Sequence, residues 1–203
     1  MITYTGERVI PDLMKPTNGM LLEHIARYQF AIYYSKGRVL DIATGCGFGA
    51  QIIAKAKKKD KIEIIGVDSS EEAIMYAKTR YHHPKVQYVV ADATDRHLPN
   101  RLGKFDTIIS FETLEHLHDD QAFLDNVYKM LNPGGTFIIS TPFGQGRGKP
   151  TSEPFHVHQL TEDEFWGLFT KYSSVIQYYQ RGVLIEPKRF DLHYPIGIAV
   201  CTK

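Results

Sequence analysis

The segment Asp41-Ile42-Ala43-Thr44-Gly45-Cys46-Gly47-Phe48-Gly49 decides the fold, because it joins a short apolar run to a helical pattern through a glycine-rich turn. Residues 38–42 are typical of a buried strand, and the spacing predicts a helix over about residues 50–57. Gly45 and Gly47 allow positive φ angles and a close approach of the backbone to a ligand. The first turn of the following helix offers N–H groups to an anionic or polar ligand.

Working outward, the same strand-to-helix unit recurs along the chain. Strands are expected at residues 62–68, 86–90, 105–110 and 136–140, and helices near residues 20–36, after residue 69 and over 120–131. Strands that alternate with helices predict an α/β fold, a mostly parallel sheet with helices on both faces. After a helix at 161–172, strands at 175–179 and 196–201 lack a helix between them, which predicts an antiparallel C-terminal hairpin at the sheet edge.

The length and charge of the chain narrow the classes of function. A chain of 203 residues fits one domain, and 24 basic against 23 acidic side chains predict no dominant grip on nucleic acid. Cys46 and Cys201 lie far apart and have no metal-ligand spacing, so neither a disulfide framework nor a zinc site is expected. No signal peptide and no apolar stretch long enough for membrane insertion is recognised, which predicts a cytoplasmic protein.

Two acidic side chains end neighbouring strands beyond the glycine turn. Asp68 follows the glycines by about 20 residues, where a carboxylate can accept hydrogen bonds from both hydroxyls of a ribose. Asp92 ends the next strand, where an acceptor can take the exocyclic amine of adenine. The glycine spacing is G-x-G-x-G, whereas dinucleotide binders favour G-x-G-x-x-G. The alternative stays open that Asp41 only caps the turn and that Asp68 and Asp92 only cap helices.

Five segments in order carry a family resemblance, namely residues 39–47, 66–68, 91–93, 105–117 and 131–135. Their sequences are Val-Leu-Asp-Ile-Ala-Thr-Gly-Cys-Gly, Gly-Val-Asp, Ala-Asp-Ala, Phe-Asp-Thr-Ile-Ile-Ser-Phe-Glu-Thr-Leu-Glu-His-Leu and Leu-Asn-Pro-Gly-Gly. The series resembles the class I S-adenosylmethionine-dependent methyltransferases, especially the branch that acts on small molecules. The resemblance spans about residues 37 to 142. It implies a Rossmann-like, seven-stranded sheet whose last strand is antiparallel and inserted beside the fifth.

The resemblance also implies a set of residues around the cofactor S-adenosylmethionine: Asp41, Ala43, Gly45, Gly47, Asp68, Ser69, Asp92, Ala93, Phe111 and Glu112. The glycine turn would contact the methionine end of the cofactor, and Asp41 would help to hold its amino group. Asp68 would hold the ribose hydroxyls, and Asp92 with the Ala93 backbone would hold adenine. Phe111 and Glu112 would line the cofactor beneath the transferring methyl group.

Methyl transfer depends mainly on positioning, because the sulfonium is already an activated electrophile. A hydroxyl or ammonium acceptor must also lose a proton, which requires a general base. His116 and His156 are the candidate catalytic residues, since histidine titrates near neutral pH. The alternative for His116 is that its turn only packs against the next loop.

The acceptor side of the site is assigned to four side chains: Tyr4, Arg8, Arg147 and His158. His156 and His158 would share one face of an extended segment, but no third ligand accompanies them, so no metal is expected. The chain divides into an N-terminal lid and helix (1–36), a cofactor-binding core (37–142), a substrate lid (143–160) and a helix with an edge hairpin (161–203).

The resulting hypothesis is methyl transfer to an O or N atom of a small-molecule acceptor by a monomer or homodimer. An RNA or protein methyltransferase, and a catalytically silent protein that keeps the cofactor fold, are the alternatives.

Overall fold

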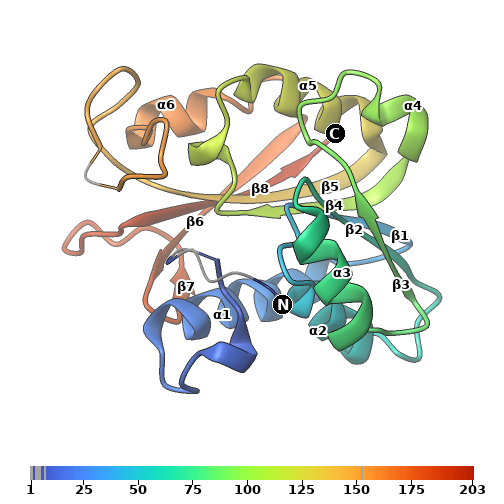
Figure 1. Cartoon of the computed structure of the whole chain (residues 1–203). Coiled ribbons are helices and arrows are strands. Elements are labelled where there is room, and N and C mark those ends of the chain that lie inside the picture. The colour runs from blue at the N-terminus through green and yellow to red at the C-terminus, as the bar shows by residue number, and fades with distance from the viewer. Residues whose placement is uncertain (1, 3–5, 7, 152) are drawn as a thin grey trace.

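The computed structural model describes residues 2, 6, 8–151 and 153–203. Within that part of the chain, eight strands form one sheet in the order β3-β2-β1-β4-β5-β8-β6-β7 (Figure 1). Their bounds are β1 (Arg38–Ile42), β2 (Glu63–Asp68), β3 (Val86–Val90), β4 (Phe105–Phe111), β5 (Leu131–Pro142), β6 (Ser174–Arg181), β7 (Leu184–Glu186) and β8 (Ile196–Thr202). Strands β1 to β5 pair in parallel, and β8 is antiparallel to both β5 and β6. The predicted α/β class and antiparallel C-terminal hairpin are confirmed.

The C-terminal part of the sheet differs from the expectation in one detail. The sheet has eight strands, where the family resemblance implied seven, because β7 folds back and pairs with β6. Gly182 at φ 59° makes the tight turn between the two strands. A strand of three residues carries too few side chains to give an alternating pattern, so the sequence did not reveal it. As the resemblance implied, β8 lies beside β5, so the sheet edge is formed by β7.

Helices cover both faces of the sheet (Figure 1). On one face lie α1 (Gly19–Tyr34), α2 (Phe48–Ala56) and α3 (Glu71–Arg80), and on the other lie α4 (Leu98–Leu102), α5 (Asp120–Met130) and α6 (Glu162–Gly167). Two short 3-10 helices, η1 (Pro11–Leu13) and η2 (Leu114–His116), complete the set. The predicted helix over 161–172 ends at Gly167, and α4 was not expected, since five residues are too few for a periodic pattern.

Side chains at helix starts explain where the helices begin. The Asn18 side chain accepts a hydrogen bond from the Leu21 N–H at 3.0 Å and caps α1. At α6, Thr161 and Glu164 form a reciprocal capping box. Both helices therefore start at residues that satisfy their exposed N–H groups.

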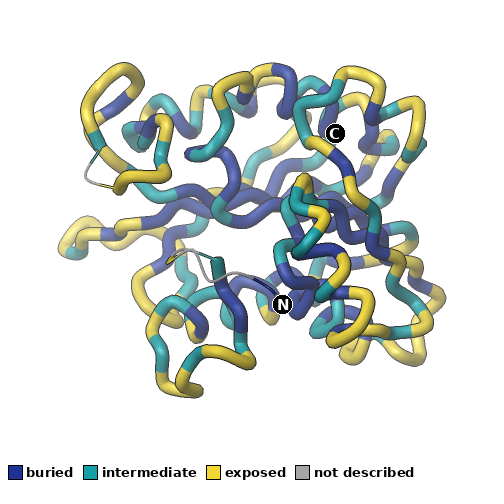
Figure 2. The backbone as a smooth tube through the Cα atoms, viewed as in Figure 1, coloured by how far each residue is buried: buried dark blue, intermediate teal, exposed yellow. Residues whose placement is uncertain are grey.

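The core consists of two apolar clusters, one on each side of the sheet, and the central strands between them are mostly dark blue, that is buried, in Figure 2. In β1, Val39 belongs to the cluster under α1 and α2, whereas Leu40 and Ile42 belong to the opposite cluster. Because side chains alternate along a strand, Asp41 shares the side of Val39 and faces α1. This alternation carries a carboxylate from the sheet toward the helix layer beside the glycine turn.

The carboxyl ends of the parallel strands bring three loops together. The Thr44 N–H donates to the Val67 carbonyl at 2.9 Å, and the Glu112 N–H donates to the Ser140 carbonyl at 3.3 Å. The loops after β1, β2 and β4 therefore meet at one edge of the sheet, where open α/β folds bind ligands.

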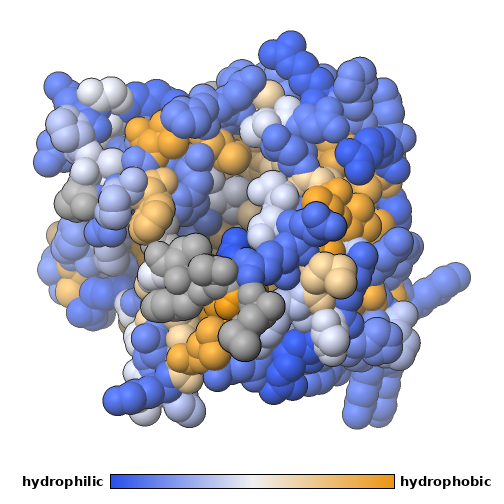
Figure 3. All heavy atoms as spheres, viewed as in Figure 1, coloured by the Kyte–Doolittle hydropathy of each residue, from blue (hydrophilic) through white to orange (hydrophobic). Residues whose placement is uncertain are grey.

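Polar residues cover most of the face seen in Figure 3. Among the described residues, the helices are all too short or too polar to cross a bilayer.

Candidate functional site

A cavity of about 880 Å³ opens at the carboxyl ends of β1, β2 and β4. Its lining includes six of the residues predicted to hold the cofactor: Ala43, Gly45, Asp68, Ser69, Phe111 and Glu112. Arg8 and both candidate catalytic residues, His116 and His156, also line it. The volume falls within the range of small-molecule sites, roughly 300 to 1,000 Å³. The structure thus gathers residues from three strand ends, α1 and the loop after β5 around one hollow.

The two glycines of the turn after β1 have different structural roles. Gly45 has φ 56°, and no described atom lies within 4 Å of the position that a Cβ would occupy there. Gly47 has φ 87°, and a Cβ on it would lie 2.7 Å from both Ala77 and the Tyr88 ring. Gly45 therefore leaves room in the cavity, whereas Gly47 allows the turn to pack against α3 and β3.

Positive φ angles also occur at two residues of the cavity wall that are not glycine. Ala43 has φ 57° and Glu112 has φ 50°, and both residues line the cavity. A left-handed conformation costs a residue with a side chain roughly 1 to 3 kcal/mol. Hydrogen bonds hold Glu112 in place, since the Ser140 hydroxyl donates to its carboxylate at 2.7 Å. Such strain is commonly stored at functional sites, which marks this wall of the cavity.

Asp68 ties the first two loops to each other. One carboxylate oxygen accepts from the Gly45 N–H at 2.9 Å, and the other accepts from the Ser70 N–H at 2.9 Å. Each carboxylate oxygen can accept a second hydrogen bond. Asp68 is only partly buried and lines the cavity, so it keeps the capacity to accept hydrogen bonds from two vicinal hydroxyls.

Asp41 occupies a different place from the other predicted cofactor residues. Its side chain is fully buried and does not line the cavity. Its carboxylate accepts hydrogen bonds from the Thr44 hydroxyl at 2.6 Å and the Tyr28 hydroxyl at 3.1 Å. Burial raises the pKa of Asp41 to about 7. The predicted contact with the cofactor amino group stays a prediction, and the structure gives Asp41 the position of a support beneath the turn.

The raised pKa of Asp41 leads to a pH-dependent stability. Between the unfolded pKa near 4 and the folded pKa of about 7, the folded protein binds the extra proton, so raising the pH destabilises it. From pH 5 to pH 8, we expect Asp41 to lower the free energy of unfolding by about 2 kcal/mol. Urea melts at both pH values should show a smaller loss for Asp41→Asn than for the wild type. Equal losses would contradict the assignment.

Asp92 and Ala93, predicted to hold adenine, lie outside the cavity lining. The exposed Asp92 carboxylate accepts hydrogen bonds from the Thr94 N–H at 2.8 Å and its hydroxyl at 2.7 Å. The Ala93 carbonyl accepts from the Asn126 side-chain amide at 2.9 Å. Both residues follow β3, which neighbours β2, so they border the Asp68 side of the site and their role stays a prediction.

The two candidate catalytic histidines meet at the acceptor side of the cavity. The rings of His116 and His156 pack edge to face, with centroids 4.9 Å apart. The adjoining Glu115 was not singled out from the sequence, although it belongs to the turn after β4. Its fully buried carboxylate accepts from the Thr141 hydroxyl at 3.0 Å. Burial and the neighbouring Glu112 carboxylate raise the pKa of Glu115 well above its usual range.

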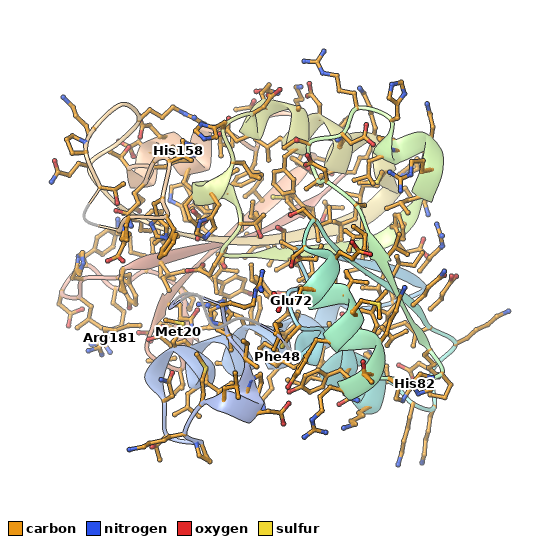
Figure 4. The ribbon with its side chains drawn as sticks, in the orientation of Figure 1. Met20, Phe48, Glu72, His82, His158 and Arg181 are labelled. Carbon is orange, nitrogen blue, oxygen red and sulfur yellow. The ribbon has the colours of Figure 1, made fainter. Side chains whose placement is uncertain are left out.

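The structure does not bring Arg147 and His158 to the cavity. The Arg147 guanidinium pairs with the Asp120 carboxylate, and the His158 Nε2 lies 3.8 Å from that same carboxylate. Figure 4 places His158 beside α6, away from Met20 and Phe48, which line the cavity. The expectation that His156 and His158 share one face of an extended segment is wrong, because the chain bends between them at Val157, where the N–H groups of Val157 and His158 both donate to the Glu115 carbonyl.

The remaining acceptor-side predictions fall at the N-terminus. Arg8 lines the cavity, and its guanidinium lies 3.9 Å from the Glu72 carboxylate. Tyr4 lies outside the described residues.

Helix α1 supplies cavity residues that the sequence analysis missed. Tyr28 and Arg27 are buried, and the Arg27 guanidinium donates to the Gln180 side chain at 2.7 Å. Burial and the Arg27 charge lower the pKa of His24 to about 4, so this imidazole is neutral at pH 7. Arg27 is not part of the apolar pattern of α1, so no rule of helical spacing predicts that it is buried. Only its contact with β6 in the folded structure reveals its buried position.

Comparisons with known proteins find methyltransferases. The methyltransferase domain family model matches residues 40–139. A probable S-adenosylmethionine-dependent methyltransferase from Mycolicibacterium smegmatis is 33% identical over 165 residues, which are 79% of this chain and 60% of that protein. Phosphoethanolamine N-methyltransferase 1 of Arabidopsis thaliana is 36% identical over 105 residues, covering 51% of this chain and 20% of its own.

A solved structure with the same fold is the S-adenosylmethionine-dependent methyltransferase from Aquifex aeolicus, with a TM-score of 0.66 and 17% identity. The match covers 94% of this chain and 95% of that one. Against the M. smegmatis relative, the chain spans only about 60% of the relative's length. The matched segment contains the glycine turn, Asp68, Asp92 and the Phe111-Glu112 pair. The chain therefore belongs to the class I S-adenosylmethionine-dependent methyltransferase family.

Proposed function

We propose that this chain binds S-adenosylmethionine in the cavity and transfers its methyl group to an O or N atom of a small-molecule acceptor. The observation that carries the proposal is the convergence of the Gly45 turn, Asp68 and the Phe111-Glu112 wall on one hollow of about 880 Å³. A hollow that size holds a nucleoside with an amino-acid tail and leaves room for a second small molecule.

The residues of the cavity suit the chemistry of this cofactor. Asp68 has acceptor capacity for both ribose hydroxyls, and the space beside Gly45 admits the methionine tail. The Glu112 side chain on the cavity wall offers a carboxylate that favours a positively charged sulfonium. The bound cofactor supplies an electrophilic methyl carbon, so the protein's own contribution is orientation of the acceptor against it. Asp41 would act as a positioning residue, through Thr44 and Tyr28.

Several features support a small-molecule acceptor. The near balance of basic and acidic side chains argues against RNA, which needs a positive surface. The similarity to a phosphoethanolamine N-methyltransferase supports a nitrogen acceptor, and an oxygen acceptor would need a base such as His116 or His156. Residues 143–160 would act as the lid. We further propose a cytoplasmic monomer or homodimer.

Calorimetry and product analysis test this function. We expect the chain to bind one equivalent of S-adenosylmethionine with a micromolar dissociation constant, in the range usual for enzyme ligands. With labelled cofactor and fractionated metabolite extracts, label should appear in one small-molecule product while S-adenosylhomocysteine accumulates. An absence of cofactor binding at millimolar concentration would refute the proposal, and binding without turnover on any extract would favour the catalytically silent alternative.

A further inference from the structure

Glu115, His116 and His156 form a compact group of metal-ligating side chains at the acceptor side of the cavity. One ligand atom from each residue lies within 4.8 Å of the other two. Glu115 and His116 come from η2 after β4, whereas His156 comes from the loop that precedes α6, 40 residues later. Folding of the chain therefore brings the three residues together, and all three line the cavity.

The protonation of His116 is set by the backbone. Its Nδ1 lies 3.0 Å from the Phe155 carbonyl, which can only accept, so Nδ1 carries the proton. The lone pair of this imidazole is then on Nε2, which lies 3.9 Å from the Glu115 carboxylate. Histidines that ligate metals typically donate their other N–H to a carbonyl or carboxylate in this way.

The charges around this group favour a cation. Glu115 is 1% exposed, and among the described residues its carboxylate accepts one side-chain hydrogen bond, from Thr141. Glu112 precedes Glu115 in the same turn and lines the same cavity, so a second carboxylate borders this group. Burying a carboxylate beside another one is costly unless a cation compensates the charge.

We propose that Glu115, His116 and His156 bind a divalent transition-metal ion on the acceptor side of the cavity. Two imidazoles and one carboxylate on one face of an ion suit first-row metals and leave other coordination positions open. The sequence analysis expected no metal because it paired His156 with His158. In the folded chain His156 lies beside His116 and not beside His158, and Glu115 is the third ligand of the group.

This inference refines the function proposed above and rests on it in one respect. An ion in this group would face the cavity and could hold an oxygen of the acceptor beside the cofactor. A hydroxyl bound to such an ion would have a lowered pKa and would release its proton to water, without a histidine base. The two imidazoles would then serve as ligands, and the acceptor would carry a coordinating oxygen near the methylated atom.

Binding of Mn²⁺ to the chelator-treated full chain tests the site without turnover. In titrations with MnCl2, the electron paramagnetic resonance signal of free Mn²⁺ should show one bound ion per chain. His156→Gln and Glu115→Gln should weaken binding roughly tenfold or more. His82→Gln is the matched control and should bind Mn²⁺ as the wild type does. His82 is exposed and follows α3, on the opposite side of the view from His158 in Figure 4. Binding that is absent in the wild type, or equal in all four proteins, would overturn the proposal.

Folding and cofactor binding are measured in the same proteins. Glu115→Gln keeps the size of a buried side chain, and melting curves should show a folded protein for each variant used. If Glu115→Gln does not fold, His156→Gln, at a partly exposed residue, decides alone. Calorimetry with S-adenosylmethionine separates the two proposals: Mn²⁺ binding without cofactor binding refutes the methyltransferase function and leaves the metal site standing, and the reverse result refutes only the metal site.

Discussion

Replacement of Gly49 by alanine should destabilise the protein by about 3 kcal/mol, because it forces overpacking where α1 crosses α2. A Cβ at residue 49 would lie 1.9 Å from the Tyr28 ring. The Tyr28 ring cannot move away without losing contacts, since its hydroxyl donates to buried Asp41. The ring centroid also lies 5.6 Å from that of Phe48 and 5.1 Å from that of Phe111, in edge-to-face contacts. Urea denaturation followed by far-UV circular dichroism measures the loss.

The control for this substitution is a glycine of the turn that precedes α2. Gly45→Ala places a methyl group where no described atom lies within 4 Å, so only its φ of 56° opposes the change, at about 1 kcal/mol. A double-mutant cycle with Tyr28→Ala should show a strong coupling between residues 28 and 49, because truncation of the ring removes the clash. Additive changes in the free energy of unfolding would show that the Gly49 variant is destabilised for another reason.

The second large effect concerns cofactor binding through Asp68. We expect Asp68→Ala to weaken the binding of S-adenosylmethionine by about 3 kcal/mol, or roughly 100-fold, through the loss of two charge-assisted hydrogen bonds to ribose. Part of the loss comes from the turn, because the Gly45 N–H loses its acceptor at 2.9 Å. Isothermal titration calorimetry at fixed pH and salt measures the change in dissociation constant.

A surface aspartate separates this effect from a change in net charge. Asp60 is exposed in the loop between α2 and β2, where its carboxylate lies 3.3 Å from Lys57 Nζ. Asp60→Ala removes the same charge and should leave the dissociation constant within about twofold, since exposed ion pairs contribute little. Asp68→Asn is informative as well, because it keeps one hydrogen-bond acceptor and should fall between the wild type and the alanine variant. A wild-type affinity in Asp68→Ala would remove the ribose contact from the proposed site.

Local sequence patterns predicted most of the sheet. The apolar runs at residues 38–42 and 105–110 became β1 and β4, and the glycine turn between strand and helix lies at the cavity. These elements were predictable because hydrophobic periodicity and turn chemistry act within a few residues of each other. Short elements such as α4 and β7 were missed, since they contain too few side chains for a period to be read.

The placement of individual side chains was less predictable. Asp41 and Asp68 both lie near the carboxyl ends of parallel strands, yet one is buried against Tyr28 while the other lines the cavity. The difference arises because Tyr28 approaches from α1, a helix that the sequence does not locate relative to β1. Arg27 and Glu115 were missed for a similar reason, because both are buried by partners from distant parts of the chain.

The histidines give the clearest contrast between local and long-range information. From the chain alone, residues 41 to 49 with Asp68 and Asp92 suffice to predict an α/β cofactor fold, because each motif works through its own backbone and the ends of parallel strands meet in any such sheet. No local rule indicates that His116 meets His156 instead of His158. That pairing depends on the Phe155 carbonyl, which lies 3.0 Å from His116 Nδ1, and on the packing of His158 against Asp120, which are contacts between segments far apart in sequence.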